Sequence, residues 1–387
     1  MSRLIAYVGS GSGGIEIFEI GEGGKAITKL DGGVEEPKYA GFLGYAKKAQ
    51  VLYAVDERKD AGRNDPCPTT VMAFKVDPKT AALKLINKQP TIGCSCASVC
   101  VGPDEKNIFT ANHGKFDCVI KAVETADGKW TNQFVYDDST IVQYPVNADG
   151  SIEPASDCFV LTGHGMDPNS SPQGGGHSQA SPHAHIVVVD PSGKFLIACE
   201  KASEKIYVFR LGGDKLTLAS IYQAPLRTGP RHCAFDKAGH MFMTCEFSSE
   251  IWSFAFDDVN GVLSFIDKQS TVAPGFSGRN ELATVQVTPD GKLVYVNNRG
   301  EDTIVGFKIA ADGKLKETFR TGVGKCPADP KDAVRDMQLT PDGKVLLVPV
   351  RPDMVVRSYA VNGETGELTP VTDVPTKDPV FICLAEL

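Results

Sequence analysis

The sequence of 387 residues lacks long hydrophobic runs and lacks an excess of basic residues. No apolar run reaches the roughly 18 to 20 residues that a membrane-spanning helix needs. The 40 Lys and Arg are outnumbered by 48 Asp and Glu, which gives a net charge of −8, and no basic cluster offsets this balance. Both observations argue against a membrane or a nucleic-acid partner. With 42% hydrophobic and 23% charged residues, the composition is that of a globular chain with a full core, which excludes disorder.

The chain also lacks the patterns that are typical of secretion and of zinc sites. Its first ten residues read as a strand that enters a glycine turn, whereas a signal peptide needs a longer apolar stretch. The eleven cysteines are odd in number and mostly scattered, so we expect reduced thiols and a cytoplasmic location. Cys94, Cys96 and Cys100 form the one tight group, but no second half-site accompanies them. We therefore expect no metal there, and the sequence leaves a redox role open.

No stretch holds a 3.6-residue apolar period over three turns, so we predict an all-β fold. Instead, 39 Gly and 24 Pro punctuate short β-branched and aromatic runs. A six-residue apolar strand, in most copies preceded by a Pro-Asp-Gly-Lys type turn, recurs with starts at residues 5, 52, 108, 195, 241, 294 and 346. Most spacings are close to 50 residues, and about four strands in that length are typical of one propeller blade. The sequence predicts a seven-bladed β-propeller with four-stranded antiparallel blades.

The repeat pattern also predicts how the ring closes and where it is interrupted. The first repeat lacks an inner strand, and residues 379–384 can supply it. We therefore expect residues 1–387 to form a single propeller domain that is closed by the C-terminal strand pairing in the N-terminal blade. The long spacing after residue 108 holds insertions near 115–139 and 162–180. The glycine-rich second insertion is typical of a functional lid or of a disordered loop, and the roles of both stay open.

In a propeller, residues at equivalent strand ends of successive blades form a ring at one mouth of the central channel. The sixth position of the seven repeats gives Ser10, Glu57, His113, Glu200, Glu246, Arg299 and Arg351. A second ring, from the strand before each turn, gives Ala97, His185, Arg231, Ala283 and Arg335. Titratable groups of both signs in a closed channel indicate a functional site.

Structural roles compete with functional ones for the carboxylates of the first ring. Glu57 or Glu200 can hold the blades together by pairing with an Arg of a neighbouring blade. The sequence contains no Gly-x-Ser-x-Gly elbow, and none of its cysteines lies in an unmistakable catalytic context. A nucleophilic mechanism is therefore the weaker interpretation.

Three interpretations are open for the histidines. Alternation along Ser181-Pro-His-Ala-His185 places His183 and His185 on the same face. Catalysis, a hydrogen bond between blades and metal binding all fit that placement. A metal would need His164 or His177 as a further ligand, and no nearby carboxylate completes such a site. We therefore expect no metal.

The order of several short motifs carries a resemblance to a known family. The motifs are Ser181-Pro-His-Ala-His185, Gly229-Pro-Arg-His232, Cys245-Glu246, Asn298-Arg-Gly300 and Arg335-Asp336, with Leu52-Tyr-Ala-Val-Asp-Glu57 as a further match. Each is weak by itself, but in this order they are specific and cover nearly the whole chain. The chain resembles the lactonase family of seven-bladed propellers, which includes cycloisomerase-type 6-phosphogluconolactonases and carboxy-cis,cis-muconate cyclases.

The resemblance implies a catalytic set. The family's active-site His, first Arg, Glu and second Arg map onto His185, Arg231, Glu246 and Arg299. For hydrolysis, Glu246 would act as general base on water and His185 would protonate the leaving alkoxide. The two arginines would stabilise the oxyanion and hold an anionic group of the substrate. For cyclisation, they would orient a polycarboxylate while His185 or Glu246 handles the proton that adds to carbon. No cofactor is implied.

Four more channel residues, His183, Glu57, His113 and Arg335, are the expected contacts to a small anionic substrate. The segment Ala283-Thr-Val-Gln286 departs from the family's Ala-Glu-Ile-His and so lacks one carboxylate and one His. We expect a hydrolase of a small anionic sugar-acid lactone, similar to 6-phosphogluconolactonase. A muconate-type cycloisomerase and a non-catalytic propeller that binds a protein or a small anion are the alternatives. The charged ring argues against the last, and the oligomeric state stays open.

Overall fold

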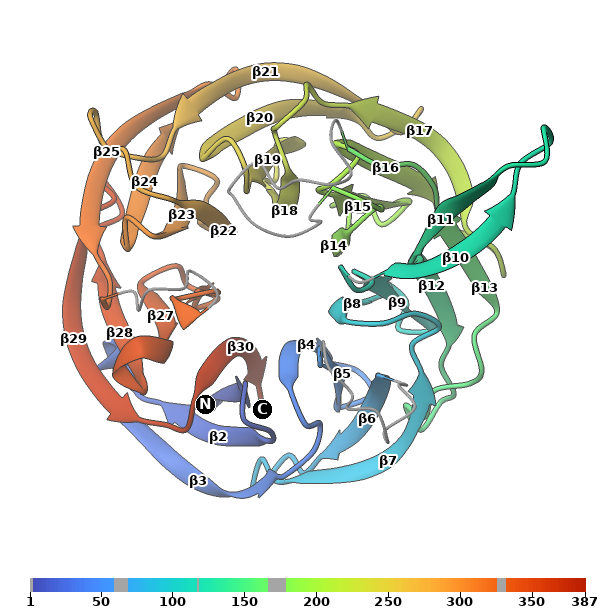
Figure 1. The fold of residues 1–387 in the computed structure, drawn as a ribbon. Coiled ribbons are helices and arrows are strands. Elements are labelled where there is room, and N and C mark those ends of the chain that lie inside the picture. Colours follow the sequence, from blue (N-terminus) through green and yellow to red (C-terminus); the bar gives the residue numbers. More distant parts are fainter. Residues whose placement is uncertain (1–2, 59–68, 117, 166–178, 326–331) are drawn as a thin grey trace.

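The computed structural model describes residues 3–58, 69–116, 118–165, 179–325 and 332–387. Seven four-stranded antiparallel sheets stand around a central axis, and a separate two-stranded sheet lies at the rim (Figure 1). The predicted seven-bladed β-propeller is confirmed. The 3-10 turns η1 (Glu22–Gly24) and η3 (Arg351–Asp353) are short, and no helix in the described ranges has the length and apolar character needed to cross a membrane.

Each blade runs from an inner strand beside the axis to an outer strand at the rim. The inner strands are β30 (Pro379–Glu386), β4 (Ala40–Ala46), β8 (Cys96–Val101), β14 (Ala184–Val189), β18 (Pro230–Phe235), β22 (Glu281–Val287) and β26 (Gln338–Leu339). The second strands are β1 (Leu4–Ser10), β5 (Val51–Asp56), β9 (Asn107–Asn112), β15 (Phe195–Glu200), β19 (His240–Cys245), β23 (Leu293–Arg299) and β27 (Val345–Val350).

The outer half of each blade faces solvent on part of its surface. The third strands are β2 (Ile15–Ile20), β6 (Thr70–Val76), β12 (Ser139–Pro145), β16 (Lys205–Arg210), β20 (Glu250–Asp257), β24 (Thr303–Ile309) and β28 (Val355–Val361). The outer strands are β3 (Ile27–Val34), β7 (Leu83–Pro90), β13 (Asp157–Leu161), β17 (Thr217–Gln223), β21 (Val262–Ser270), β25 (Leu315–Gly322) and β29 (Leu368–Pro375).

The C-terminal strand β30 is the inner strand of the blade that begins the chain. It pairs antiparallel with β1, from Leu4 opposite Glu386 to Gly9 opposite Phe381. The backbone N–H of Leu387 donates to the carbonyl oxygen of Arg3 at 2.9 Å. Both ends of the chain are thus hydrogen-bonded in one sheet, which leaves no open edge between the last blade and the first.

Apolar side chains between neighbouring sheets fix the blades against one another. Every residue of β5 and of β15 is buried, whereas the outer strand β7 is largely exposed. One core cluster joins Ile197 and Val208 of the fourth blade with Met243 and Phe254 of the fifth. Burying each such side chain contributes roughly 1.5–3 kcal/mol, so the contacts between blades hold the central residues in place.

In every blade except the first, a short turn joins the inner strand to the second strand. In the fourth blade, Oδ1 of Asp190 accepts the backbone N–H groups of Lys194 and Phe195 at 2.9 and 2.7 Å. Gly193 adopts φ +73° in this turn, a conformation that glycine reaches without steric cost. The second strand therefore starts at this turn and ends at the opposite face of the propeller.

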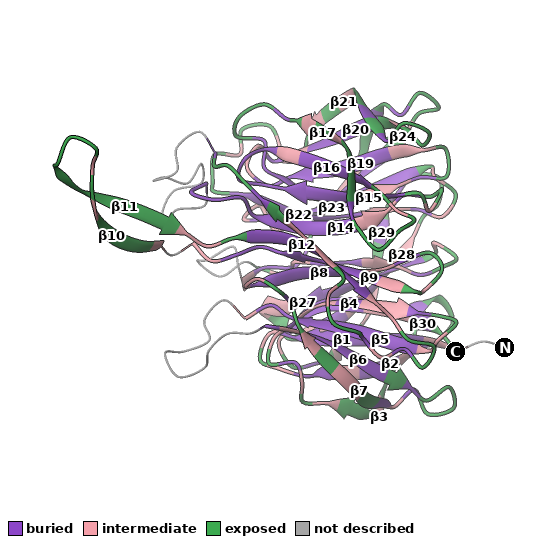
Figure 2. Cartoon of the chain, turned by 90° about the vertical axis from the view of Figure 1, so that its right-hand side faces the viewer, coloured by how far each residue is buried: buried purple, intermediate pink, exposed green. Residues whose placement is uncertain are grey.

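The predicted insertion near 115–139 forms a hairpin of β10 (Cys118–Glu124) and β11 (Trp130–Tyr136). Cys118 pairs with Tyr136 at its base and Glu124 with Trp130 near its tip. The hairpin projects beyond the blades (Figure 2). Most of the second insertion, residues 166–178, lies outside the described residues.

Candidate active site

Irregularities in the inner strands position the second predicted ring. The pairing register of β14 shifts at His185, and that of β18 shifts across Arg231 and His232. The pairing register also shifts at the equivalent positions of two other inner strands, at Ala97 in β8 and at Ala283 in β22. A β-bulge bends its strand and redirects a side chain out of the ladder. The bulges therefore place His185, Arg231 and His232 differently from regular strand residues.

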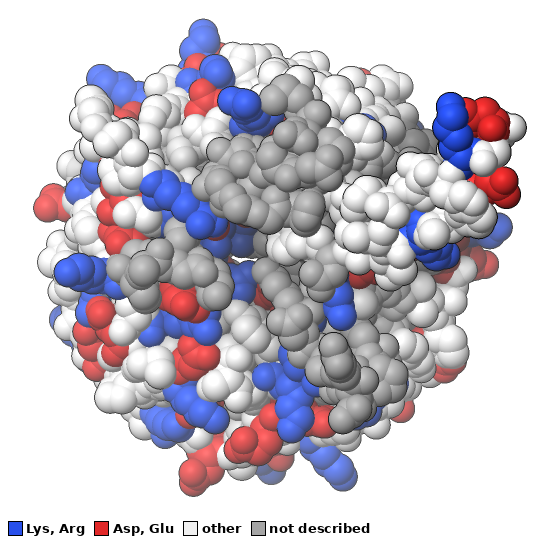
Figure 3. Space-filling model, viewed as in Figure 1, with Lys and Arg blue, Asp and Glu red and all other residues white. Residues whose placement is uncertain are grey.

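The first predicted ring lies where the second strands end, on the face of the propeller that Figure 1 presents. β15 and β23 end at Glu200 and Arg299, while Glu57, His113 and Glu246 directly follow β5, β9 and β19. Lys and Arg side chains gather around the centre of this face (Figure 3). Strand ends and bulges thus bring residues of different blades to one mouth.

Glu246 is the centre of a buried charge cluster. Its Oε1 accepts a hydrogen bond from Nζ of Lys201 at 2.9 Å, and its Oε2 accepts one from Nε of Arg231 at 2.7 Å. Nη2 of Arg299 lies 3.4 Å from the same Oε2. Burial alone raises the pKa of Glu246, but the charges of Lys201, Arg231 and Arg299 outweigh burial and hold the pKa well below its usual value. Glu246 is therefore ionised at neutral pH, and a carboxylate so stabilised is a weak base.

The two arginines keep donors that the described chain does not use. Nη1 of Arg231 and Nε of Arg299 are buried and have no hydrogen-bond partner within the described ranges. Arg299 also pairs with Glu281, whose Oε2 lies 3.1 Å from Nη2. Burial, and then the charge of Arg299, lowers the pKa of Arg231 to about 9, so its guanidinium stays charged at neutral pH. Buried charged donors without a partner cost free energy, and a bound anion would remove that cost.

Three of the predicted histidines form an aromatic wall beside this cluster. His113 stacks on His183 with ring centroids 4.3 Å apart, and His185 meets His113 edge-on at 5.9 Å. Phe116 makes edge contacts with His113 at 5.1 Å and with His183 at 4.8 Å. The backbone N–H of His183 donates to Oε1 of Glu200 at 2.8 Å. Glu200 thus acts as an acceptor for backbone groups, which fixes the segment that carries His183.

His232 adds a second imidazole to His185. Nε2 of His232 lies 3.2 Å from Nδ1 of His185, and Nδ1 of His232 lies 3.3 Å from Oγ1 of Thr284. Burial, and then the charge of Arg231, lowers the pKa of both histidines well below the usual value. Both imidazoles are therefore neutral at pH 7. Since a neutral imidazole has one donor and one acceptor nitrogen, one ring of this pair donates and the other accepts.

Glu57 and Arg335, two of the predicted substrate contacts, are engaged with each other. Nη2 of Arg335 lies 2.8 Å from Oε1 of Glu57, and its Nη1 donates to the hydroxyl of Tyr39 at 2.6 Å. Glu57 belongs to the second blade and Arg335 to the seventh, so the ion pair reaches across the first blade. Small Ser10 occupies the ring position there. The expectation that Glu57 pairs with an Arg of a neighbouring blade is therefore wrong, because its partner belongs to the next blade but one. The charges of Glu57 and Arg335 compensate each other.

The ring positions of the sequence do not include three residues of the cluster, namely Lys201, His232 and Glu281. Lys201 directly follows Glu200, so a shift of the ring by one position in this blade would have found it. His232 adjoins Arg231 in the Gly-Pro-Arg-His motif, but only the bulge brings both residues into the site. Glu281 lies two residues before Ala283 and reaches Arg299. The segment Ala283-Thr-Val-Gln286 lacks the carboxylate of the family motif, but Glu281 brings another carboxylate of the same blade to Arg299.

The described residues show no arrangement for a metal. Within those ranges no group of three or more His, Cys, Asp or Glu could hold an ion, and His177, a suggested ligand, lies outside them. Nδ1 of His164 lies 2.7 Å from the carbonyl oxygen of Gly165. Burial raises the pKa of Cys96, and that of Cys100 to about 11. Both thiols are thus protonated at neutral pH, which makes them poor nucleophiles.

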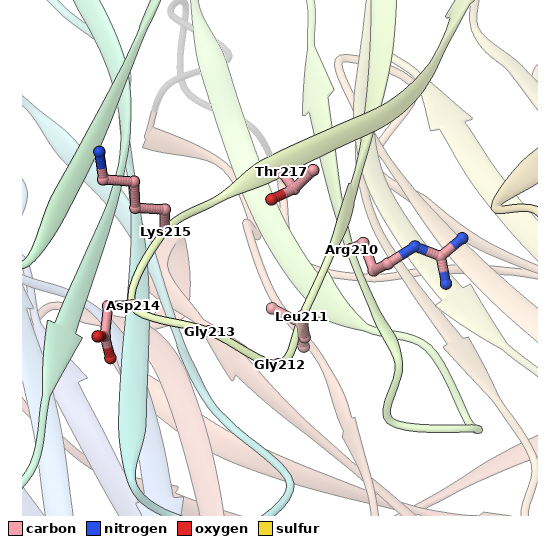
Figure 4. A pocket seen from close by; sticks show the side chains of 7 residues that line it. All are labelled: Arg210, Leu211, Gly212, Gly213, Asp214, Lys215 and Thr217. Atoms are coloured by element: carbon pink, nitrogen blue, oxygen red, sulfur yellow. The ribbon is translucent and has the colours of Figure 1, made fainter.

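Two other pockets that are lined by described residues hold no cluster of buried charges like the one around Glu246. One of about 240 Å³ lies at the turn between β16 and β17, where Arg210 and Lys215 point away from each other (Figure 4). A larger pocket of about 690 Å³ is lined mainly by apolar and aromatic side chains such as Trp252 and Phe265. The cluster around Glu246 is therefore the candidate active site.

Comparisons with known proteins agree with this architecture. The family described as "Lactonase, 7-bladed beta-propeller" matches residues 5–384. A 6-phosphogluconolactonase from Bacillus subtilis (strain 168) is 26% identical over 320 residues, which cover 80% of this chain and 78% of that protein.

Solved structures extend the likeness over the full length. A periplasmic gluconolactonase from Pseudomonas aeruginosa has a TM-score of 0.82 at 22% identity, covering 99% of each chain. A protein from Lactobacillus plantarum has a TM-score of 0.79 at 23% identity and covers 100% of both chains. At such identities the structures establish a shared fold, and the chemistry has to be argued from the site.

Proposed function

The chain belongs to the lactonase family of seven-bladed β-propellers, and on that premise we propose that it hydrolyses the lactone of a small anionic sugar acid, as a 6-phosphogluconolactonase does. One observation carries the proposal. Buried arginine donors without a partner lie next to a histidine that is neutral at pH 7. Such a site binds an anion and offers a base in its active form.

Arg231 and Arg299 act on the electrophilic side of the reaction. Nη1 of Arg231 and Nε of Arg299 are the available donors, and they either hold an anionic group of the substrate or stabilise the oxyanion. Because Glu246 holds both side chains, the donors are positioned before the substrate arrives. Donors of this kind typically contribute about 10² to 10³ in rate.

His185 moves the proton. Its imidazole takes a proton from water as the water oxygen adds to the lactone carbonyl carbon, which forms a tetrahedral oxyanion. As the oxyanion collapses, the ring C–O bond breaks, and His185 returns the proton to the leaving alkoxide. The ring-opened hydroxy acid is the product, and His185 is neutral again. General acid–base help of this kind contributes roughly 10² to 10⁴-fold.

The geometry assigns Glu246 another role than the general base that the family resemblance suggested. Lys201 engages Oε1 of Glu246, and Arg231 and Arg299 engage Oε2, so neither carboxylate oxygen is free to take a proton from water. Glu246 instead compensates the charges of Lys201, Arg231 and Arg299 and fixes their positions. We therefore place the base at His185 and the organising anion at Glu246.

The test is a proton-release assay with purified protein and 6-phosphogluconolactone or gluconolactone, corrected for spontaneous hydrolysis. We expect His185→Gln to lower kcat by roughly 10²-fold or more. His240→Gln is the matched control, because His240 bonds to Asp236 in a turn on the opposite face and should keep activity within about twofold.

Three results would contradict this function. A rate no greater than spontaneous hydrolysis with both lactones would reject the substrate class. Full activity of His185→Gln would reject the base. Turnover of a muconate-type acid in place of either lactone would favour the cyclisation alternative, for which the same arginines would orient a polycarboxylate.

A further inference from the structure

The hairpin of β10 and β11 exposes large apolar side chains. Ile120, Trp130 and Phe134 lie on one face of it and are 58%, 72% and 50% exposed. An isolated two-stranded hairpin is marginally stable in water, and contiguous exposed apolar groups mark interaction sites. Figure 2 shows the hairpin standing away from the blades. Both its composition and its position therefore favour a partner.

The two open edges of this hairpin differ in chemistry. β10 carries Lys121 at its centre and Glu124 at its end, whereas β11 contains no charged residue, no Pro and no Gly. Natural sheets protect open edges with charges, proline or irregularities, because a bare edge pairs with other strands. β10 is protected in this way and β11 is not. The partner is thus expected to be a strand at the β11 edge.

The sequence of β11 is complementary to itself. Two antiparallel copies related by a twofold axis at Gln133 place Trp130 opposite the partner's Tyr136 and Thr131 opposite the partner's Val135. Aromatic and β-branched cross-strand pairs each stabilise an antiparallel ladder. The equivalent pairing of β10 would place Lys121 opposite the partner's Lys121, which is unfavourable.

We propose that the protein forms a symmetric homodimer in which the β11 strands of two copies pair edge to edge into a four-stranded sheet. In the dimer both β11 edges are paired, and only the two β10 edges remain open. Lys121 protects these edges from further pairing, so assembly stops at two copies. A seven-residue strand is only about 24 Å long, so the contact is smaller than a standard interface of roughly 800 Å² per partner. The dimer should therefore be reversible, with a dissociation constant in roughly the micromolar range.

Analytical ultracentrifugation of the full chain from roughly 1 to 200 µM tests the dimer. We expect the mean mass to rise from one copy towards two over that range. Gln133→Glu places two like charges on the twofold axis but faces Lys121 as an opposite charge within the hairpin, so it should weaken the dimer, by at least about tenfold, without weakening the hairpin. The matched control Ala122→Glu adds the same charge to β10 and should change the dissociation constant by no more than about twofold.

A hairpin deletion separates loss of the interface from loss of folding. Replacing residues 118–136 by two glycines should give a monomer with the melting curve of the propeller. The base can close because the backbone N–H of Lys115 donates to Oδ2 of Asp137 at 3.0 Å across it. A wild-type chain that stays monomeric at all concentrations would overturn the proposal, as would equal weakening by Ala122→Glu and Gln133→Glu.

Cysteine crosslinking tests the register. In the proposed ladder the two Cα atoms of residue 133 lie roughly 4.5–5.5 Å apart, within the range for a disulfide. Those of residue 135 lie about 14 Å apart. Under mild oxidation we expect Gln133→Cys, and not Val135→Cys, to give a covalent dimer above the wild-type level on a non-reducing gel. Equal crosslinking of both variants, or assemblies larger than a dimer, would refute the closed twofold pairing.

Discussion

Asp336 offers a quantitative test of how the last blade is held against the first. Its carboxylate is only 2% exposed, and Oδ2 accepts the backbone N–H of Ile382 in β30 at 3.0 Å. Burial raises its pKa from 3.8 to about 7, although the hydrogen bond from Ile382 opposes the shift. Ionisation of this buried side chain therefore lowers the free energy of unfolding. Asp336→Asn keeps an oxygen acceptor for Ile382 and removes the charge.

The sign and size of the effect follow from linkage. A carboxyl whose folded-state pKa is raised binds its proton more tightly in the folded state, so stability falls as pH rises from about 4 to about 7. The difference between 3.8 and about 7 corresponds to about 4 kcal/mol, at about 1.4 kcal/mol per unit. The unfolding free energy of Asp336→Asn should therefore exceed that of the wild type by an amount that grows with pH and reaches about 4 kcal/mol at pH 8. At pH 4 the two proteins should be close.

Urea unfolding of both proteins between pH 4 and pH 8 measures this difference. Other titrating groups, such as the buried histidines, contribute equally to both proteins and cancel in the comparison if they do not couple to Asp336. The result that refutes the reasoning is a stability difference that does not change with pH, or one that favours the wild type more strongly at pH 8.

Three further outcomes are expected. Glu246→Gln removes the counter-ion of the buried Lys201 and Arg231 and leaves Arg299 with Glu281. We therefore expect a loss of roughly 3–5 kcal/mol in unfolding free energy together with lower kcat; an unchanged melting temperature would contradict the charge-organising role. Arg299→Ala should raise KM and lower kcat, whereas Arg279→Ala, which removes a half-exposed partner of Glu281, should leave kcat within about threefold; equal kinetic losses would place the substrate elsewhere. Deleting residues 379–387 should abolish cooperative unfolding, because it removes the inner strand of the first blade, and a truncated chain with a normal melting curve would show that closure is dispensable.

The fold was predictable because its information is local and repeated. In most copies a Pro-Asp-Gly-Lys type turn precedes the apolar strand and specifies one corner of a blade, as the hydrogen bonds of Asp190 to the next strand show. Seven copies at blade spacing leave few alternatives. The strand count per blade follows from the spacing of about 50 residues, and the position of the C-terminal strand follows from the need to leave no open edge.

The candidate site was only partly predictable, because the β-bulges and the ion pairs between side chains differ from blade to blade. A ring built from equivalent positions finds His185, Arg231, Glu246 and Arg299. It fails for His232, since a regular strand would point that side chain away from its neighbour Arg231, and only the register shift in β18 brings both into the site.

Which charged side chains pair with each other near the axis depends on the size of the side chains between them. Glu57 pairs with Arg335 across the first blade, because Ser10 leaves room there. Glu281 reaches Arg299 from a strand position that the family motif does not mark. Neither pairing follows from the spacing of the repeats, since both depend on which neighbours are small.

The charge balance of the cluster connects its anion binding to its neutral histidines. The buried cations are Lys201, Arg231 and Arg299, and the buried carboxylates are Glu246 and Glu281, so three positive charges face two negative ones. One positive charge in excess attracts an anion into a protein whose net charge is −8. The same excess disfavours protonation of the neighbouring histidines, which keeps them in the base form while the site is empty. In the proposed mechanism, an anionic substrate would remove that excess and raise the proton affinity of His185, so substrate binding would bring its pKa closer to the value that proton transfer needs.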